Sequence, residues 1–269
     1  MSISSTSYNH LLIIDPQNDF VDPNGALYVT GAEKDAVHLA RFIDHAAIDA
    51  ISISLDSHHK MDISHPSWFF DQQGQHPAAF TQINSADLIA GTWQCSTEAY
   101  ARTLEYLHAL EKNQRYPHII WPEHCLIGST GHAIYPVIFE ALQNWTVKNQ
   151  TLNFIRKGEN IWTEHFSAVE AEVPDPQDAH TQINQQLIDQ LKQADQVWVT
   201  GWARSHCVGN TVRDLVRYGG EELAHKLILL SDTMSDVGGF EPLGEAFVED
   251  VMQAGVRVQK TSDIIKTEN

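Results

Sequence analysis

Side chains with complementary chemistry follow four short apolar runs of the chain. They are a carboxylate at Asp15, a metal-ligand pair at Asp56 and His58, an ammonium at Lys157 and a thiol at Cys207. Where parallel strands form an open sheet, ligands bind beyond the carboxyl ends of the strands. One charged residue at one such end is unremarkable, whereas four complementary groups at four ends are improbable by chance. We therefore expect these groups to meet at one edge of a sheet.

Cys207 is the strongest candidate for a nucleophile. It falls at the predicted first turn of a helix, where unpaired backbone N–H groups and the helix dipole favour a thiolate. A neighbouring Lys157 ammonium would lower the pKa of the thiol further, and Asp15 could accept or return its proton. The other cysteines lack this company. Cys95 is expected to be structural, and Cys125 to pack beneath the histidine that precedes it.

A second group of residues could bind a metal ion. Asp56 and His58 alternate at a predicted strand end, so both side chains can project into one pocket, and His65 lies further along the same loop. His124, in the segment WPEHC, must come from elsewhere in the chain. Three imidazoles and one carboxylate suit Zn²⁺, with Fe²⁺ or Mn²⁺ as alternatives and water completing the shell.

Composition excludes several classes of protein. The chain has 269 residues, 42% hydrophobic and 19% charged, which is typical of a globular protein with a large core. Lys and Arg number 17 against 35 Asp and Glu, and the net charge of −18 argues against nucleic acid or a membrane as the main partner. Three widely spaced cysteines suit a reducing compartment. The first ten residues lack a basic region and a long apolar stretch, so we expect no signal peptide and a cytoplasmic protein.

The elements that would position these residues alternate along the chain. Six short runs have the apolar character of strands buried on both faces. They span residues 10–14, 50–55, 152–156, 196–200, 226–230 and 256–259. Between them lie helix-period faces formed by Val37, Ala40, Ile43 and Ala47; by Ile183, Leu187, Leu191 and Ala194; by Val208, Val212, Leu215 and Tyr218; and by Leu243, Phe247, Val251 and Ala254. The alternation predicts an α/β protein with a parallel sheet covered on both faces.

The chain shows no internal repeat or low-complexity linker, so residues 1–269 are interpreted as one domain. Residues from about 61 to 99 stand apart, because they are rich in His, Gln, Ser, Pro and Trp and show little periodicity. A loop of that length in a compact domain is usually functional or mobile. We expect a loop-rich elaboration over the edge of the sheet.

Five segments resemble one family of enzymes. They are LLIIDPQNDF, LDSHHKMDISHPSWF, WPEHC, FIRKG and VTGWARSHCVGNTVRDL, and ILLSDTMSDVGG comes after them. In this order they resemble the nicotinamidase and isochorismatase-like cysteine hydrolases, above all the metal-bearing nicotinamidase branch. Each segment alone is modest evidence, but five in the family order cover most of the chain and are highly specific.

This resemblance implies a fold, a catalytic apparatus and a metal site. The fold is a three-layer α/β sandwich with a six-stranded parallel sheet, the Rossmann-like fold of isochorismatase-like hydrolases. The catalytic triad would be Asp15, Lys157 and Cys207, and the four metal-ligand candidates would hold one divalent ion. A cis peptide between Trp202 and Ala203 would direct the N–H groups of Ala203 and Cys207 at a developing oxyanion.

The resemblance also implies an activity, the hydrolysis of a small primary amide through a Cys207 thioester. Nicotinamide, converted to nicotinate and ammonia in NAD salvage, is the first choice because the metal ligands are present. Aromatic candidates for the wall of the substrate pocket are Phe20, Trp68, Trp121 and Trp202. Members of the family often form dimers or tetramers, although no feature of this sequence marks an interface.

Three other functions stay open on the sequence. After Lys157 and Gly158 the chain reads ENIWTEHFSAVEAEVPDP, which departs from the family pattern, so a related hydrolase could act on another amide or a ureido compound. A catalytically silent, metal-holding protein is a second alternative, but it has no chemical need for all three triad residues. A nucleotide-binding domain is disfavoured because no G-x-G-x-x-G follows the first strand-like run.

Overall fold

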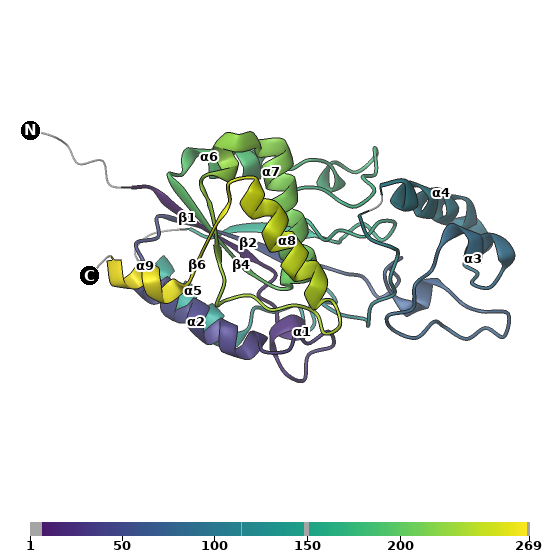
Figure 1. The fold of residues 1–269 in the computed structure, drawn as a ribbon. Coiled ribbons are helices and arrows are strands. Elements are labelled where there is room, and N and C mark those ends of the chain that lie inside the picture. The colour runs from purple at the N-terminus through teal and green to yellow at the C-terminus, as the bar shows by residue number, and fades with distance from the viewer. Residues whose placement is uncertain (1–6, 114, 148–150, 268–269) are drawn as a thin grey trace, which may run out of the picture.

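A parallel sheet is the centre of the fold. The computed structural model describes residues 7–113, 115–147 and 151–267. Six parallel strands lie in the order β3-β2-β1-β4-β5-β6 (Figure 1). Their bounds are Asn9–Ile14 (β1), Ala50–Asp56 (β2), Asn153–Lys157 (β3), Gln196–Gly201 (β4), Leu227–Leu230 (β5) and Arg257–Gln259 (β6). Each strand overlaps its predicted run and differs from it by no more than one residue at either end.

Helices cover both faces of this sheet. The α-helices are α1 (Asn18–Val21), α2 (Ala32–His45), α3 (Ser85–Ala90), α4 (Thr97–Asn113), α5 (Pro136–Thr146), α6 (Gln185–Gln193), α7 (Gly209–Ala224), α8 (Glu241–Gln253) and α9 (Thr261–Thr267). Short 3-10 turns are η1 (Pro66–Trp68) and η2 (Ala179–Thr181), and a π-helical turn is η3 (Arg204–Val208). Helices α2, α5 and α9 pack together on one side of the sheet, and α6, α7 and α8 on the other (Figure 1). The expected three-layer α/β sandwich is confirmed.

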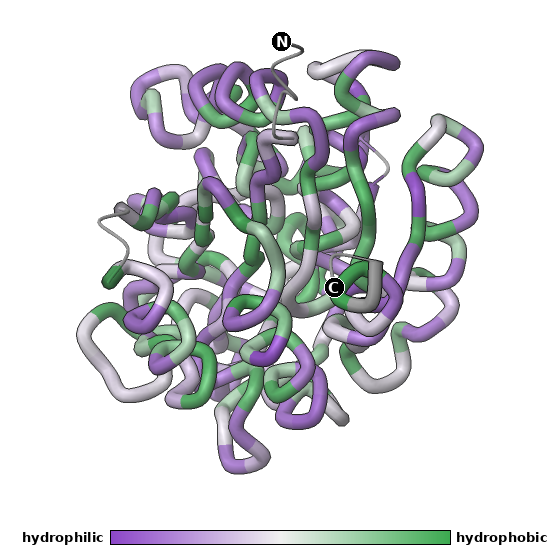
Figure 2. Tube along the Cα trace, turned by 90° about the vertical axis from the view of Figure 1, so that its left-hand side faces the viewer, coloured by the Kyte–Doolittle hydropathy of each residue, from purple (hydrophilic) through white to green (hydrophobic). Residues whose placement is uncertain are grey.

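The strands are apolar because they are buried on both faces. Residues Leu11–Ile14 of β1 have no exposed surface, and β4 and β5 are buried almost throughout. Figure 2 shows hydrophobic strands through the middle of the molecule and hydrophilic stretches concentrated in the outer coils. Within the described ranges, no helix combines the length and the apolar character needed to cross a membrane.

The predicted apolar face of α2 is confirmed in part, because Ala40 and Ile43 are buried. Its buried stripe includes Ala36, Leu39 and Ile43, whereas Val37 is 55% exposed. Both stripes have the helical period, and the buried one brings the bulkier Leu39 and Phe42 against the core. Periodicity alone did not distinguish between the two stripes, because Val37 and Leu39 are both apolar and each begins a stripe of helical period.

In the predicted helix faces, residues in the middle are buried as expected, whereas some residues at the ends are exposed. Ala47 and Ile183 lie outside α2 and α6 and are exposed, and Leu243 in the first turn of α8 is 38% exposed. Leu187 and Leu191 in the middle of α6 are buried as predicted.

The elaboration after β2 is larger than predicted. It lies between His65 and His124 and includes α3 and α4, which project away from the sheet (Figure 1). Its apolar residues form a cluster of their own around Phe69 and Leu107. The cluster also has a partner outside the elaboration, since Trp162, which follows β3, packs edge-on against Trp68 in η1 with ring centroids 4.8 Å apart. The elaboration and the segment after β3 therefore support each other.

Candidate active site

The triad residues meet at the carboxyl edge of the sheet. Lys157 Nζ is 2.8 Å from Asp15 Oδ2 and 3.6 Å from Cys207 Sγ, and all three side chains are buried. The strand order explains the meeting, because β3, β2, β1 and β4 are successive neighbours and the three residues end or follow β3, β1 and β4. The long Lys157 side chain spans the strand between.

Asp15 is fixed in a conformation that few residues adopt. Its φ is +49°, in the left-handed region that Asp tolerates better than most residues. The Ser54 hydroxyl donates to Asp15 Oδ1 at 2.6 Å, and the Asp15 N–H donates to the Ser54 carbonyl at 3.2 Å. Beside it Gly201 has φ +123°, and a Cβ there would lie 2.0 Å from the Ile14 carbonyl oxygen. Only glycine fits where β4 ends against β1.

Cys207 sits in the turn η3, directly before α7. The Trp202–Ala203 peptide that precedes the turn is cis, as the resemblance implied. Among the residues described, no acceptor is paired with the Ala203 N–H. Arg204 anchors the turn, since its Nε donates to Asp236 Oδ1 at 3.0 Å. The thiol therefore occupies a turn whose first residue is fixed by this ion pair.

The charge state of the thiol differs from the expectation. Burial raises the pKa of the Cys207 thiol well above its usual value, although Lys157 opposes the shift and Asp15 adds to it. Burial also raises the pKa of Asp15, and here too Lys157 opposes it. Burial disfavours the charge of Lys157, but Asp15 and Asp56 outweigh it and raise the pKa of Lys157 well above its usual range. The direction of the shift thus favours a neutral thiol beside the Lys157–Asp15 ion pair, whereas the sequence predicted a lowered pKa of the thiol.

Three metal-ligand candidates form a cluster next to the triad. One ligand atom from each of Asp56, His58 and His124 lies within 4.8 Å of the others. Asp56 Oδ2 is 3.2 Å from His58 Nε2 and 3.3 Å from His124 Nε2. The contact with His58 lacks hydrogen-bond geometry, so His58 Nε2 is buried without a hydrogen-bond partner in the part of the chain that is described. A carboxylate and two imidazoles converging in this way fit a divalent ion.

Contacts behind the rings set the direction of their lone pairs. His58 Nδ1 is 3.1 Å from Asp62 Oδ2, and His124 Nδ1 donates to the Pro122 carbonyl at 2.8 Å. Because a carbonyl or carboxylate can only accept, the Nδ1 atom is the donor in both contacts, which leaves the Nε2 atom of each ring on the side of Asp56. Burial opposes protonation of His58, but Asp56 and Asp62 outweigh it and raise the pKa of His58 well above its usual value. The cluster therefore favours a positive charge at this point.

His65 lies beside the cluster rather than within it. Its ring centroid is 5.0 Å from that of His58 and 5.3 Å from that of His124, and its Nε2 is 3.4 Å from His124 Nδ1. That nitrogen of His124 faces Pro122, so His65 does not point at the shared atoms. The structure thus brings together three of the four predicted ligands and places the fourth against them.

Asp56 joins the two groups of residues. Its Oδ1 accepts from Lys157 Nζ at 2.9 Å, while its Oδ2 faces the imidazoles. Gln17 fixes the main chain at this position, because its side chain donates to the Asp56 carbonyl at 2.7 Å and accepts from the Asp56 N–H at 2.7 Å. Sequence reasoning missed Gln17 and Asp62, whose only signal was their position inside the segments that carry the ligands.

A small cavity lined by buried residues opens onto Cys207. Phe20 and Trp121 line it as predicted, together with Glu164, Phe166 and His206, which sequence reasoning did not single out. Burial raises the pKa of Glu164 and lowers that of His206 to about 4. Aromatic rings thus form part of the wall beside two carboxyl groups, and the lowered pKa of His206 favours its neutral imidazole.

Two predicted wall residues are placed elsewhere. Trp68 belongs to the core of the elaboration, where its Nε1 donates to Thr103 Oγ1 at 3.1 Å. Trp202 is fully buried and directs its Nε1 to Asp35 Oδ2 at 3.4 Å. In both cases the indole N–H finds a partner away from the cavity, which is how buried Trp side chains are usually oriented.

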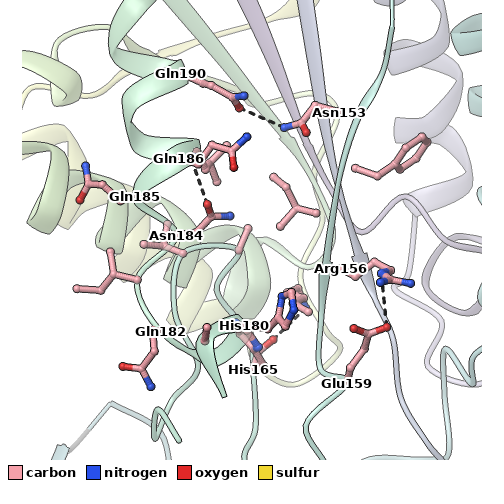
Figure 3. Close-up of a pocket in the computed structure, with 18 residues that line it drawn as sticks. Asn153, Arg156, Glu159, His165, His180, Gln182, Asn184, Gln185, Gln186 and Gln190 are labelled. Carbon is pink, nitrogen blue, oxygen red and sulfur yellow. Dashed lines mark hydrogen bonds and ion pairs between the residues drawn. The ribbon is translucent and has the colours of Figure 1, made fainter. Parts of the chain in front are cut away.

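A larger groove lies beside the site along the free edge of β3. Amide side chains line much of it, including Asn153, Gln186 and Gln190 (Figure 3). It is linked to the triad through His165, whose ring lines the groove and whose carbonyl accepts from Lys157 Nζ at 3.1 Å. The thiol opens onto the smaller cavity, so we place the chemistry there.

Known proteins match this chain by structure. A scan of family models and a search of curated proteins found no match. The nicotinamidase and pyrazinamidase of Acinetobacter baumanii has a TM-score of 0.65 at 21% identity, over 97% of this chain and 99% of that one. Yeast nicotinamidase Pnc1p, bound to the inhibitor nicotinaldehyde, has a TM-score of 0.64 at 17% identity, over 94% and 99%.

This chain has the fold of the nicotinamidases. A pyrazinamidase of Pyrococcus horikoshii in complex with zinc also matches, with a TM-score of 0.55 at 18% identity over 94% of this chain and 98% of that one. The isochorismatase-like fold expected from the sequence is confirmed, and the matches span nearly the whole chain.

Proposed function

We propose that this protein is a metal-dependent cysteine amidohydrolase that converts nicotinamide to nicotinate and ammonia. The observation that carries the proposal is the contact of Lys157 with both Asp15 and Cys207 beside a cluster of metal donors. The aromatic side chains beside the thiol can pack against a flat ring. The fold shared with nicotinamidases, one in complex with a nicotinaldehyde inhibitor, supports the choice of substrate.

Attack by the sulfur calls for a base, because burial raises the pKa of the Cys207 thiol. As the bond between Cys207 Sγ and the carbonyl carbon forms, the thiol proton moves to Asp15. Asp15 is suited to receive it, since burial raises its pKa. Lys157 keeps its charge and holds Asp15 in place through their ion pair. Lys157 is therefore a positioning and electrostatic residue, and the proton passes between sulfur, Asp15 and the substrate.

The oxyanion and the leaving group are handled by neighbouring atoms. The N–H groups of Ala203 and Cys207 would stabilise the oxyanion, with about 3–4 kcal/mol from each donor. The C–N bond then breaks and Asp15 gives its proton to the nitrogen, which leaves as ammonia. Water next attacks the Cys207 thioester and gives a proton to Asp15. The C–S bond breaks, and Asp15 returns the proton to sulfur.

Asp56, His58 and His124 would hold the divalent ion, with His65 beside them. When bound, the ion supplies positive charge and a coordination position for the ring nitrogen of the substrate, which orients the carboxamide. Zinc suits this donor set, with iron and manganese as alternatives. Every covalent step in this scheme takes place on Cys207 and Asp15.

Ammonia release from a panel of amides tests the proposal. The metal-loaded protein would be given nicotinamide, benzamide, which lacks the ring nitrogen, and a ureido compound. Nicotinamide should be hydrolysed much faster than benzamide. Preference for the ureido compound would reassign the substrate, and failure to release ammonia from any of them would contradict an amidohydrolase.

A further inference from the structure

One neighbouring segment supplies several of the contacts that hold the Cys207 turn η3. The Arg204 N–H donates to the Ser235 carbonyl at 2.8 Å, and the Val237 N–H donates to Ser205 Oγ at 3.2 Å. Both partners lie between β5 and α8. A turn held from this segment alone would be free to tilt about it, so an anchor from another part of the fold is needed to fix its orientation.

Tyr116 supplies that second anchor. Its hydroxyl donates to the Ser205 carbonyl at 2.9 Å, and both residues are buried. Burial raises the pKa of Tyr116, which keeps the hydroxyl protonated and able to donate. Among the residues that the structure describes, this is the one side chain hydrogen-bonded to the main chain of η3. Tyr116 follows α4, so the anchor comes from the elaboration.

This hydrogen bond lies close to the atoms that the chemistry would use. The Ser205 carbonyl belongs to the peptide group that joins Ser205 to His206, and the next peptide group carries the N–H of Cys207. Because each peptide group is planar, fixing one carbonyl limits the tilt of the group that follows. Tyr116 thus fixes the main chain two residues before the thiol.

The ring of Tyr116 supports the wall of the Cys207 cavity. Its centroid is 5.2 Å from that of His206 and 5.5 Å from that of Phe166, and both of these residues line the cavity. Tyr116 does not line the cavity itself, so its ring lies one layer behind the wall. Removal of the hydroxyl alone would leave these ring contacts in place.

Arg115 holds the same part of the elaboration against α7. It forms an ion pair with the buried carboxylate of Asp214 at 2.9 Å, and it donates to Asn210 Oδ1 at 3.4 Å. Both partners belong to α7, which continues directly from η3. The main chain before Tyr116 is therefore fixed relative to the helix that follows the nucleophile.

We propose that Tyr116 is a positioning residue for the nucleophile. Its hydroxyl holds η3 in the orientation that keeps Cys207 Sγ 3.6 Å from Lys157 Nζ. Through this contact the elaboration contributes to the geometry of the thiol. The inference rests on the proposed function for its substrate, but the position of the thiol can be measured without one.

Alkylation of Cys207 by iodoacetamide in Tyr116→Phe tests the proposal without a substrate. Lys157 lowers the pKa of the thiol against the effect of burial, so a thiol that moves away from Lys157 is less often a thiolate. Alkylation at pH 8 should therefore be about threefold slower than in wild type, the scale expected for loss of one hydrogen bond. The labelled Cys207 peptide would be quantified by mass spectrometry.

Steady-state kinetics with nicotinamide give a second readout. In Tyr116→Phe, kcat should fall about tenfold because the thiol is misplaced relative to the bound amide. KM should change by less than about twofold, because the ring contacts with His206 and Phe166 remain. A simple loss of folded protein would also lower the apparent kcat, but it would make alkylation faster, because an unfolded chain exposes Cys207.

Tyr218→Phe is the matched control. Tyr218 lies on α7, about three turns beyond Cys207, and its hydroxyl donates to Glu170 Oε1 at 2.5 Å. This variant therefore also loses one hydroxyl hydrogen bond, but away from η3, and both readouts should stay at the wild-type values. Unchanged or faster alkylation in Tyr116→Phe, or equal changes in Tyr218→Phe, would overturn the proposal.

The two readouts separate the positioning role from the proposed function. If alkylation slows in Tyr116→Phe but the wild-type protein hydrolyses no amide, the positioning role stands and the proposed function fails. If nicotinamide is hydrolysed and Tyr116→Phe keeps the wild-type kcat and alkylation rate, the positioning role fails and the function stands.

Discussion

The two halves of the site differ in how their charge is balanced. The triad half carries its own permanent cation, because the Lys157 ammonium lies 2.8 Å from Asp15 and 2.9 Å from Asp56. The metal half places two carboxylates, Asp56 and Asp62, against the imidazole of His58. Asp56 belongs to both halves. In the triad half, the charge of the carboxylates is thus balanced by Lys157 of the protein itself. In the metal half, we expect a bound cation to balance it.

The largest effect should come from removing the nucleophile. Cys207→Ala should lower kcat for nicotinamide by at least about 10⁴-fold, since loss of a covalent nucleophile removes the pathway itself. The metal content, measured by atomic emission, should stay at the wild-type value because Cys207 is not in the ligand cluster. Substantial turnover in this variant would remove Cys207 from its proposed role.

Loss of a metal ligand should disable the metal half of the site and leave the triad half intact. His58→Ala should release the metal and lower turnover about 100-fold, the scale of effect seen when a substrate is misplaced. Alkylation of Cys207 by iodoacetamide should continue, because the triad residues keep their own contacts. A variant that retains both metal and activity would show that His58 is not a ligand.

A smaller effect should result from changing the residue that holds the ligand. Asp62→Asn keeps the shape of the side chain but weakens the contact with His58 Nδ1, and should lower metal affinity about 10–100-fold. A competition titration with a chelating dye measures this without any assay of activity. Asp71→Asn, where the side chain accepts only from local backbone N–H groups, is the matched control and should bind metal normally. Equal affinities in the two variants would contradict the role of Asp62.

The smallest effect concerns stability outside both halves. Burial lowers the pKa of His10 in β1 to about 4, against 6.5 for a free imidazole. The unfolded chain thus takes up a proton that the folded chain refuses, and stability is lost as the pH falls from about 6.5 toward 4. The loss at this one residue is about 3 kcal/mol at most. Urea unfolding at pH 7.5 and 5.0 should show a smaller decline for His10→Asn than for wild type, and parallel declines would contradict this assignment.

The site residues at strand ends were predictable, because the residue that follows a short apolar run lies at the carboxyl end of a strand. Asp15, Asp56 and Lys157 lie where their runs stop, and a parallel sheet brings such ends to one edge. The direction of the pKa shift of Cys207 was not predictable, because it depends on burial that only the packed structure shows. Trp68 and Trp202 point away from the cavity toward hydrogen-bond partners whose distance in sequence, 35 residues for Trp68 and 167 for Trp202, hides them.

The elaboration shows a different limit. Its helices α3 and α4 pack on each other and on residues after β3. Their apolar faces therefore belong to a second hydrophobic core, separate from that of the sheet. An analysis of the sequence that assumes a single sheet does not show which residues pack together in such a cluster. The same limit applies to Asp62 and Gln17, whose roles depend on which atoms lie opposite them.

The covalent intermediate tests the central claim most directly. Metal-loaded protein mixed with nicotinamide and quenched in acid within the first turnovers would be digested and analysed by mass spectrometry. We predict a nicotinoyl group on the peptide that contains Cys207, absent from Cys207→Ala. Rapid hydrolysis of nicotinamide with no acylated Cys207 at any quench time, and with undiminished turnover in Cys207→Ala, would contradict the account.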